Sequence, residues 1–198
     1  MTTRLAIINS GGANIASLMF AIERLGVESE LTVDPQTLRN ASHVILPGVG
    51  AAADCMARLQ DSSLAETITR LQQPLLGICV GMQLMFESSQ EGDVTCLGLL
   101  PGVVQRLPTL ENLPVPHMGW NQFSIERPSP LLQGLGNTDY VYYVHSFAAP
   151  VSSLTLASTE YGTKFSAVVQ RDNFFGVQFH PERSARTGAL LLRNFLAL

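Results

Sequence analysis

The fold of this 198-residue chain is predicted from one stretch, Pro74-Leu75-Leu76-Gly77-Ile78-Cys79-Val80-Gly81-Met82-Gln83. Its apolar first half predicts a short buried strand, and the residues from Met82 to Glu87 are typical of a helix. Because glycines flank Cys79 on both sides, the chain can turn tightly between the strand and the helix. Such a turn presents the cysteine side chain and the following backbone N–H group to the same space. The stretch therefore predicts a nucleophile at a strand-to-helix turn.

Two interpretations of Cys79 are open at this point. A helix N-terminus beside the sulfur favours the thiolate over the thiol, and the N–H of Val80 can hold a developing oxyanion. A cysteine between glycines is also compatible with a small buried hydrophobic residue. The choice depends on whether the chain also supplies a base.

A base is predicted far along the chain, in Phe175-Gly176-Val177-Gln178-Phe179-His180-Pro181-Glu182. The apolar alternation of a strand ends at His180, and side chains two residues apart project from one side of an extended chain. Glu182 is therefore expected to reach the imidazole of His180. A thiol needs a base, and the base needs an acceptor on its second ring nitrogen. Cys79, His180 and Glu182 predict a catalytic triad, although the His-Pro-Glu segment alone also suits a capped strand end.

Composition limits the other possible functions. The chain carries 12 basic and 16 acidic residues without a cluster of Lys or Arg, which disfavours nucleic acid as a partner. Three cysteines, Cys55, Cys79 and Cys96, are an odd number without a metal-ligand spacing, so we expect reduced thiols with neither a disulfide framework nor a metal site. No cofactor is expected. Asn9 and the glycines after it interrupt the uncharged N-terminal run, so neither a signal peptide nor a membrane span is predicted. We therefore expect a cytoplasmic protein.

Short apolar runs alternate with helical patterns through the first half of the chain. This alternation predicts an α/β fold with a mostly parallel central sheet, helices on both faces, and the site at the carboxyl ends of the strands. Pro47-Gly48-Val49-Gly50 follows one of these strands and can supply half of an oxyanion hole or form an ordinary turn. Strands are predicted at residues 5–8, 28–33, 43–46 and around 75, and helices at 15–25, 51–59 and 63–71.

After Gly92, short alternating runs separated by Gly, Pro and Asn predict hairpins and an additional smaller antiparallel sheet. The runs lie at residues 94–106, 118–125, 140–144, 154–159, 165–170 and 174–178, and a last helix is predicted at 188–197. No repeat or linker divides the chain, so residues 1–198 are predicted to form a single domain. The glycines at 11–12 lack the G-x-G-x-x-G spacing of a dinucleotide site.

Together, these motifs resemble the class I (triad) glutamine amidotransferases, which have a flavodoxin-like fold. The segments Gly77–Gln83 and His180–Glu182 match the family at large. Three further segments resemble one branch of it, the glutaminase subunits of imidazole glycerol phosphate synthase in histidine biosynthesis. These are Pro47–Gly50, Pro116-His117-Met118-Gly119-Trp120-Asn121 and Tyr142-Tyr143-Val144-His145-Ser146-Phe147.

The resemblance implies a division of labour among the site residues. Cys79 attacks the side-chain amide of glutamine, His180 carries the proton to the leaving ammonia, and Glu182 orients His180. The oxyanion donors are the N–H of Val80 and a backbone N–H of the Gly48-Val49 peptide. The implied glutamine pocket consists of Gly50, Gln83, Glu91, His145, Ser146 and Phe147.

The resemblance also implies a partner. Glutaminases of this branch form a heterodimer with a cyclase, a (β/α)8 barrel, which receives the ammonia through a tunnel and makes imidazole glycerol phosphate and AICAR. Asn14, Trp120, Tyr142 and Arg183 match positions at that interface. Trp120 and Tyr142 are also compatible with ordinary core aromatics.

Two alternatives remain open. The chain can be the glutaminase subunit of another pathway, such as anthranilate, purine or pyridoxal phosphate synthesis, although His117–Asn121 argues against this. It can also be a non-enzymatic thiol sensor with Cys79 as the sensing group, in which Glu182 would have no role. Glutamate release in the presence of each candidate partner separates these hypotheses.

Overall fold

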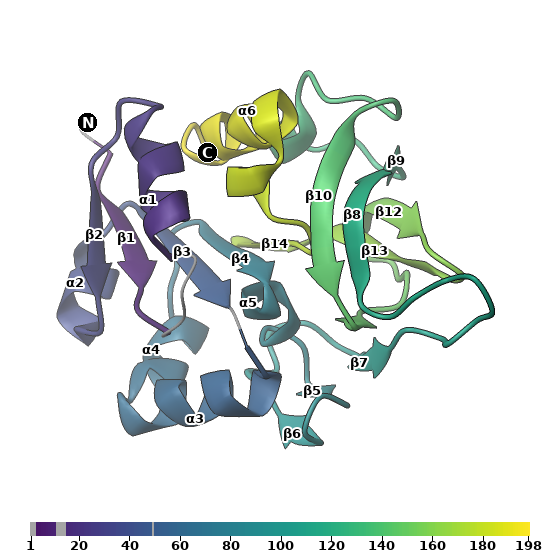
Figure 1. The fold of residues 1–198 in the computed structure, drawn as a ribbon. Helices are drawn as coiled ribbons and strands as arrows, with labels where there is room; N and C mark the ends of the chain where they lie inside the picture. Colours follow the sequence, from purple (N-terminus) through teal and green to yellow (C-terminus); the bar gives the residue numbers. More distant parts are fainter. Residues whose placement is uncertain (1–2, 11–14, 49) are drawn as a thin grey trace.

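An eight-stranded sheet runs through the computed structural model, which describes residues 3–10, 15–48 and 50–198 (Figure 1). Its strand order is β2-β1-β3-β4-β14-β13-β12-β9. The first five strands in this order are parallel, and the last three are antiparallel additions. The strands are β1 (Leu5–Ile8), β2 (Ser29–Thr32), β3 (His43–Gly48), β4 (Leu75–Cys79), β9 (Ser124–Ile125), β12 (Thr155–Glu160), β13 (Lys164–Arg171) and β14 (Phe174–Val177).

Helices cover both faces of this sheet. Figure 1 shows α1 and α6 on one side and α2, α3 and α4 on the other. Every residue of β1, β3, β4 and β14 is buried, as expected for parallel strands between two helical layers. The predicted α/β fold with a mostly parallel sheet is confirmed. The helices are α1 (Ile15–Glu23), α2 (Pro35–Asn40), α3 (Ala52–Asp61), α4 (Leu64–Thr69), α5 (Val80–Gln83) and α6 (Ala185–Phe195), with 3-10 turns η1 (Pro130–Leu132) and η2 (Pro181–Arg183).

Two small sheets stand beside the central one, where the sequence predicts a single antiparallel sheet. The first pairs β8 (His117–Gln122) with β10 (Tyr140–His145) in antiparallel register. The second has the order β11-β7-β5-β6 and is mixed, because β5 and β7 run parallel. Its strands are β5 (Ser88–Ser89), β6 (Val94–Thr95), β7 (Val103–Arg106) and β11 (Phe147–Ala148).

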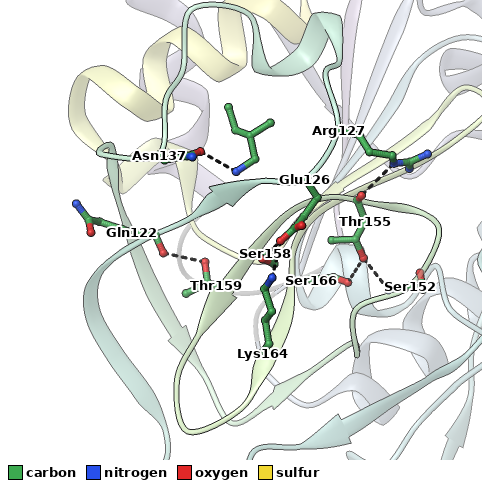
Figure 2. A network of polar contacts seen from close by, with 11 residues as sticks. Gln122, Glu126, Arg127, Asn137, Ser152, Thr155, Ser158, Thr159, Lys164 and Ser166 are labelled. Atoms are coloured by element: carbon green, nitrogen blue, oxygen red, sulfur yellow. Dashed lines mark hydrogen bonds and ion pairs between the residues drawn. The ribbon is translucent and has the colours of Figure 1, made fainter.

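Side-chain contacts hold the antiparallel edge of the central sheet together (Figure 2). Thr155 of β12 and Ser166 of β13 share a hydrogen bond of 2.7 Å between their hydroxyl groups. Lys164 Nζ lies 2.7 Å from Glu126 Oε1, and this carboxylate also accepts from the Ser158 hydroxyl. These contacts satisfy polar groups on the antiparallel strands of the sheet.

Two sequence predictions require correction, and one helix was not predicted. Residues 174–178 are not only part of a hairpin: β14 also pairs in parallel with β4, with Val177 opposite Ile78. The helix predicted through Glu87 ends at Gln83, because the carbonyls of Leu84, Met85 and Phe86 accept from a later loop, the N–H groups of Leu97, Leu100 and Gly98. Helix α2 was not predicted, although Asp34 caps it and Pro35 begins it.

Within the described residues, no helix is both long enough and apolar enough to cross a bilayer.

Candidate active site

Cys79 is the last residue of β4 and immediately precedes α5. Its φ of 53° and ψ of −113° lie where residues with a side chain are rarely found. Gly81 permits the turn, because a Cβ there would lie 1.9 Å from the carbonyl oxygen of Leu46. The start of α5 is thereby pressed against the end of β3, where Gly48 stands opposite Cys79 in the ladder. This is the strand-to-helix turn that the sequence predicts.

His180 reaches this turn because β14 lies next to β4 in the sheet. Its backbone N–H donates to the carbonyl of Tyr142 at 2.9 Å, which ties the segment to β10. The Nδ1 atom of His180 lies 2.9 Å from Glu182 Oε1, and both side chains are almost fully buried. The expected contact between His180 and Glu182 is present, but the chain between them is not extended as predicted. Residues Pro181–Arg183 form a 3-10 turn, which brings the Glu182 carboxylate to the imidazole.

The electrostatics of His180 follow from these neighbours. Burial alone lowers the pKa of a histidine, because it disfavours the charged imidazolium. Here burial is outweighed by hydrogen bonds to Cys79 and Glu182 and by their negative charges, which raise the pKa of His180 to about 10. With Nδ1 occupied by Glu182, Nε2 is the nitrogen left for the sulfur. The arrangement favours an imidazolium between a carboxylate and a thiolate.

A cavity of about 520 Å³ opens over Cys79 and His180. Every residue of the implied glutamine pocket lines it, together with the oxyanion candidates Gly48 and Val80. One of them, Glu91, accepts from the backbone N–H of Ala52 at the start of α3 (3.0 Å). Burial raises the pKa of Glu91, opposed by that hydrogen bond and supported by the charge of Asp54. The lining residues are Gly48, Gly50, Cys79, Val80, Gln83, Glu91, Pro116, Val144, His145, Ser146, Phe147, His180 and Arg183.

A chain of hydrogen bonds runs from Gln83, in the cavity wall, through Gln178 to the sulfur of Cys79. Gln178 was not among the site residues predicted from the sequence. Gln83 Nε2 donates to the Phe147 carbonyl (2.7 Å) and to Gln178 Oε1 (3.0 Å). Gln178 Nε2 in turn lies 3.7 Å from Cys79 Sγ. The available signal was a polar residue within the apolar run that leads to His180.

A pair of buried histidines lies on the other side of the Phe147 carbonyl. His145 Nδ1 lies 2.9 Å from that carbonyl oxygen, so Nδ1 carries the proton. His145 Nε2 then accepts from His117 Nδ1 (3.1 Å), and Asn121 Nδ2 lies 3.5 Å from His117 Nε2. Burial lowers the pKa of His117 to about 4. Burial, assisted by the charges of His117 and His180 and opposed by the Phe147 hydrogen bond, lowers the pKa of His145 to about 3. Both rings are therefore neutral donors and acceptors at neutral pH.

Comparison with known proteins agrees with this geometry. The family model for glutamine amidotransferase class-I matches residues 6–198. The chain belongs to the class I glutamine amidotransferase family.

Relatives of this amidotransferase include several curated subunits of one enzyme. This chain is 54% identical over 196 residues to "Imidazole glycerol phosphate synthase subunit HisH" of Xanthomonas campestris pv. campestris (strain 8004), with 99% of this chain and 98% of the relative covered. The subunit of the same name from Xylella fastidiosa (strain Temecula1) is 52% identical with the same coverage. Subunit HisH 2 of Legionella pneumophila (strain Lens) is 52% identical over 194 residues, covering 98% of each chain.

Solved structures at lower identity share the fold of this amidotransferase. A crystal structure described as a glutamine amidotransferase superposes with a TM-score of 0.75 at 18% identity, covering 98% of this chain and 97% of that one. PurLQS from Thermotoga maritima gives a TM-score of 0.70 at 18% identity, covering 100% and 99%.

Three of the predicted interface residues of this amidotransferase form one cluster. Trp120 and Tyr142 face each other across β8 and β10, with ring centroids 6.0 Å apart. The Arg183 guanidinium lies over the Tyr142 ring, 4.6 Å from its centroid. Trp120 is 52% exposed, so the interpretation of Trp120 as an ordinary core aromatic was wrong.

Two predicted residues, Asn14 and Val49, lie outside the described part of the chain. Among the described residues, no group of three or more His, Cys, Asp or Glu side chains is placed to hold a metal ion.

Proposed function

We propose that this protein is the glutaminase subunit of an imidazole glycerol phosphate synthase. It hydrolyses L-glutamine to glutamate and ammonia and passes the ammonia to a cyclase partner in histidine biosynthesis. The 2.9 Å contact between His180 Nδ1 and Glu182 Oε1, beside a strained Cys79 in one cavity, is the observation that carries the chemistry. Identity of 52–54% to HisH subunits supports this pathway over anthranilate, purine or pyridoxal phosphate synthesis.

The first half-reaction forms a thioester. The Cys79 thiolate attacks the side-chain amide carbon of glutamine, and the carbonyl oxygen becomes an oxyanion that accepts from the N–H of Val80 and from the Gly48-Val49 peptide. The His180 imidazolium gives its Nε2 proton to the amide nitrogen. The C–N bond then breaks, and ammonia leaves.

The second half-reaction restores the enzyme. His180, now neutral, takes a proton from a water molecule that attacks the thioester carbon. The C–S bond breaks, glutamate forms, and the sulfur leaves as the thiolate beside the reprotonated His180. Glu182 keeps the ring in one orientation through both steps, since its carboxylate accepts from Nδ1.

The cavity suits the two ends of glutamine. The half-buried carboxylate of Glu91 is the group for the substrate ammonium, and the backbone around Ser146 and Phe147 meets the remaining polar groups of the substrate. Gly50 completes the wall near the oxyanion donors, and its φ of 90° favours glycine.

The partner that we propose is a (β/α)8-barrel cyclase, bound as a heterodimer in the cytoplasm. The cluster of Trp120, Tyr142 and Arg183 offers an aromatic and a cationic anchor for it. Asn14 is proposed to join this interface.

The proposal is tested with Cys79→Ala in the presence of a barrel cyclase. We expect glutamine-dependent synthesis of imidazole glycerol phosphate to be abolished and synthesis from added ammonium salt to be retained. Cys96→Ala is the matched control, because Cys96 is a free thiol that does not line the cavity. Retained glutamate release by folded Cys79→Ala would contradict the mechanism, and wild-type protein that releases no glutamate with any partner would leave the thiol-sensor hypothesis standing.

A further inference from the structure

Gln178 is a buried polar side chain at the reacting sulfur. It is fully inaccessible to solvent, and its backbone N–H donates to the Ala167 carbonyl (2.9 Å) in the sheet. Its side-chain nitrogen lies 3.7 Å from Cys79 Sγ, within hydrogen-bonding range for sulfur. The triad chemistry described above makes no use of this contact.

The direction of the Gln178 amide is set by a backbone carbonyl. The carbonyl oxygen of Phe147 can only accept, so Gln83 must turn its Nε2 toward it. The same nitrogen of Gln83 faces Gln178, so Gln178 must present its oxygen to Gln83. The Gln178 NH2 group is then left to point at the sulfur. If the Gln178 amide were reversed, its NH2 group would face the NH2 group of Gln83, and its oxygen would face the sulfur of Cys79. Both hydrogen bonds of the Gln178 side chain would then be lost.

We propose that Gln178 is a further catalytic residue that stabilises the Cys79 thiolate by donating an Nε2–H hydrogen bond, with its orientation fixed by Phe147 through Gln83. A donor aimed at sulfur favours the anion over the thiol, since the hydrogen bond to a charged acceptor is the stronger one. The same donor also lowers the energy of the thiolate that leaves when the thioester is hydrolysed. This inference rests on the proposed function for its catalytic meaning, but the sulfur contact can be tested without glutamine.

The test measures alkylation of Cys79 by iodoacetamide as a function of pH in the isolated full-length protein. Mass spectrometry of the Cys79 peptide is needed, because Cys55 and Cys96 are also free thiols. In Gln178→Leu the donor is lost, and we expect the inflection of the alkylation rate to move to higher pH by about one unit, so that alkylation is about tenfold slower at pH values below the wild-type inflection. In Gln178→Glu the shape and the acceptor for Gln83 are kept while an oxygen faces the sulfur, so a shift at least as large is expected.

The matched control is Ser166→Ala. Ser166 is also fully buried on a strand of the same sheet, where its hydroxyl group contacts that of Thr155 (Figure 2). The variant loses this hydrogen bond and the one to the Pro150 carbonyl, but Ser166 does not line the cavity. Its alkylation profile should match that of the wild type. Gln178→Glu protects the test against a Gln178→Leu variant that fails to fold, because it is nearly isosteric.

Glutaminase kinetics with the cyclase separate this inference from the proposed function. If Gln178 is catalytic, both variants lower kcat about tenfold or more with a smaller change in KM. A folded Gln178→Glu variant whose alkylation profile equals that of the wild type overturns the inference, whatever its activity. Wild-type protein that releases no glutamate overturns the proposed function, even where the alkylation profiles shift as expected.

Discussion

Replacing Glu182 by Gln removes one of the two groups that keep His180 charged. Cys79 and Glu182 each contribute a hydrogen bond and a negative charge to His180, and burial opposes both. An opposite charge at this distance shifts a pKa by about 1–3 units, so we expect Glu182→Gln to lower the pKa of His180 from about 10 by about two units. Two units correspond to about 3 kcal/mol.

The interaction with Glu182 stabilises only the protonated form of His180, so its contribution to the free energy of unfolding depends on pH. The folded-state pKa of His180 is raised above its ordinary value of 6.5, so its contribution to stability is complete below pH 6.5 and is lost as pH rises through about 10. Glu182→Gln should then reduce the free energy of unfolding by about 3 kcal/mol at pH 6 and by about half of that at pH 9. It should also lower kcat by about 10⁴, because the neutral ring can adopt the wrong tautomer.

Two measurements check this reasoning: urea unfolding at both pH values, and a titration of the His180 ring nitrogens by NMR. Glu126→Gln is the control, because Glu126 pairs with Lys164 at the surface, and the paired groups are 33% and 53% exposed. No comparable pH dependence is expected from it. An equal loss of stability at pH 6 and pH 9 in Glu182→Gln, or a His180 pKa within half a unit of the wild type (about 0.7 kcal/mol), would refute the account.

Three further predictions concern packing, the buried histidines and the partner surface. Gly81→Ala should cost about 3 kcal/mol or more in urea unfolding, because its Cβ would lie 1.9 Å from a Leu46 backbone oxygen, whereas Gly136→Ala, with open space, should change stability by less than about 0.5 kcal/mol. At pH 6, ring ¹⁵N spectra should show His117 and His145 neutral with the proton on Nδ1, and stability should fall as pH drops from 6.5 toward about 4; an imidazolium signal from either ring at pH 6 would contradict their assignment. Trp120→Ala should leave the isolated protein stable within about 1 kcal/mol but weaken cyclase binding more than tenfold in calorimetry, and unchanged affinity would exclude it as an anchor.

The strand-to-helix turn at Cys79 and the contact between His180 and Glu182 were predictable because their signals are local. A cysteine between two glycines, placed between a strand and a helical segment, specifies the turn through short-range sterics alone. His180 and Glu182 are two residues apart, so their contact needs little of the remaining fold, and the prediction survived although the chain between them forms a 3-10 turn instead of an extended segment.

Contacts between segments far apart in the sequence determined the features that could not be predicted. The alternation in residues 174–178 suits a hairpin strand and a central strand equally, and only the pairing of β14 with β4 brings His180 to Cys79. The length of α5 depended on where Leu97, Gly98 and Leu100 find carbonyl acceptors. The contact of Gln178 with the sulfur depends on Gln83 and the Phe147 carbonyl, which come from separate elements. Which group donates and which accepts between such segments depends on how the fold places them in space. The sequence around each residue does not contain this information.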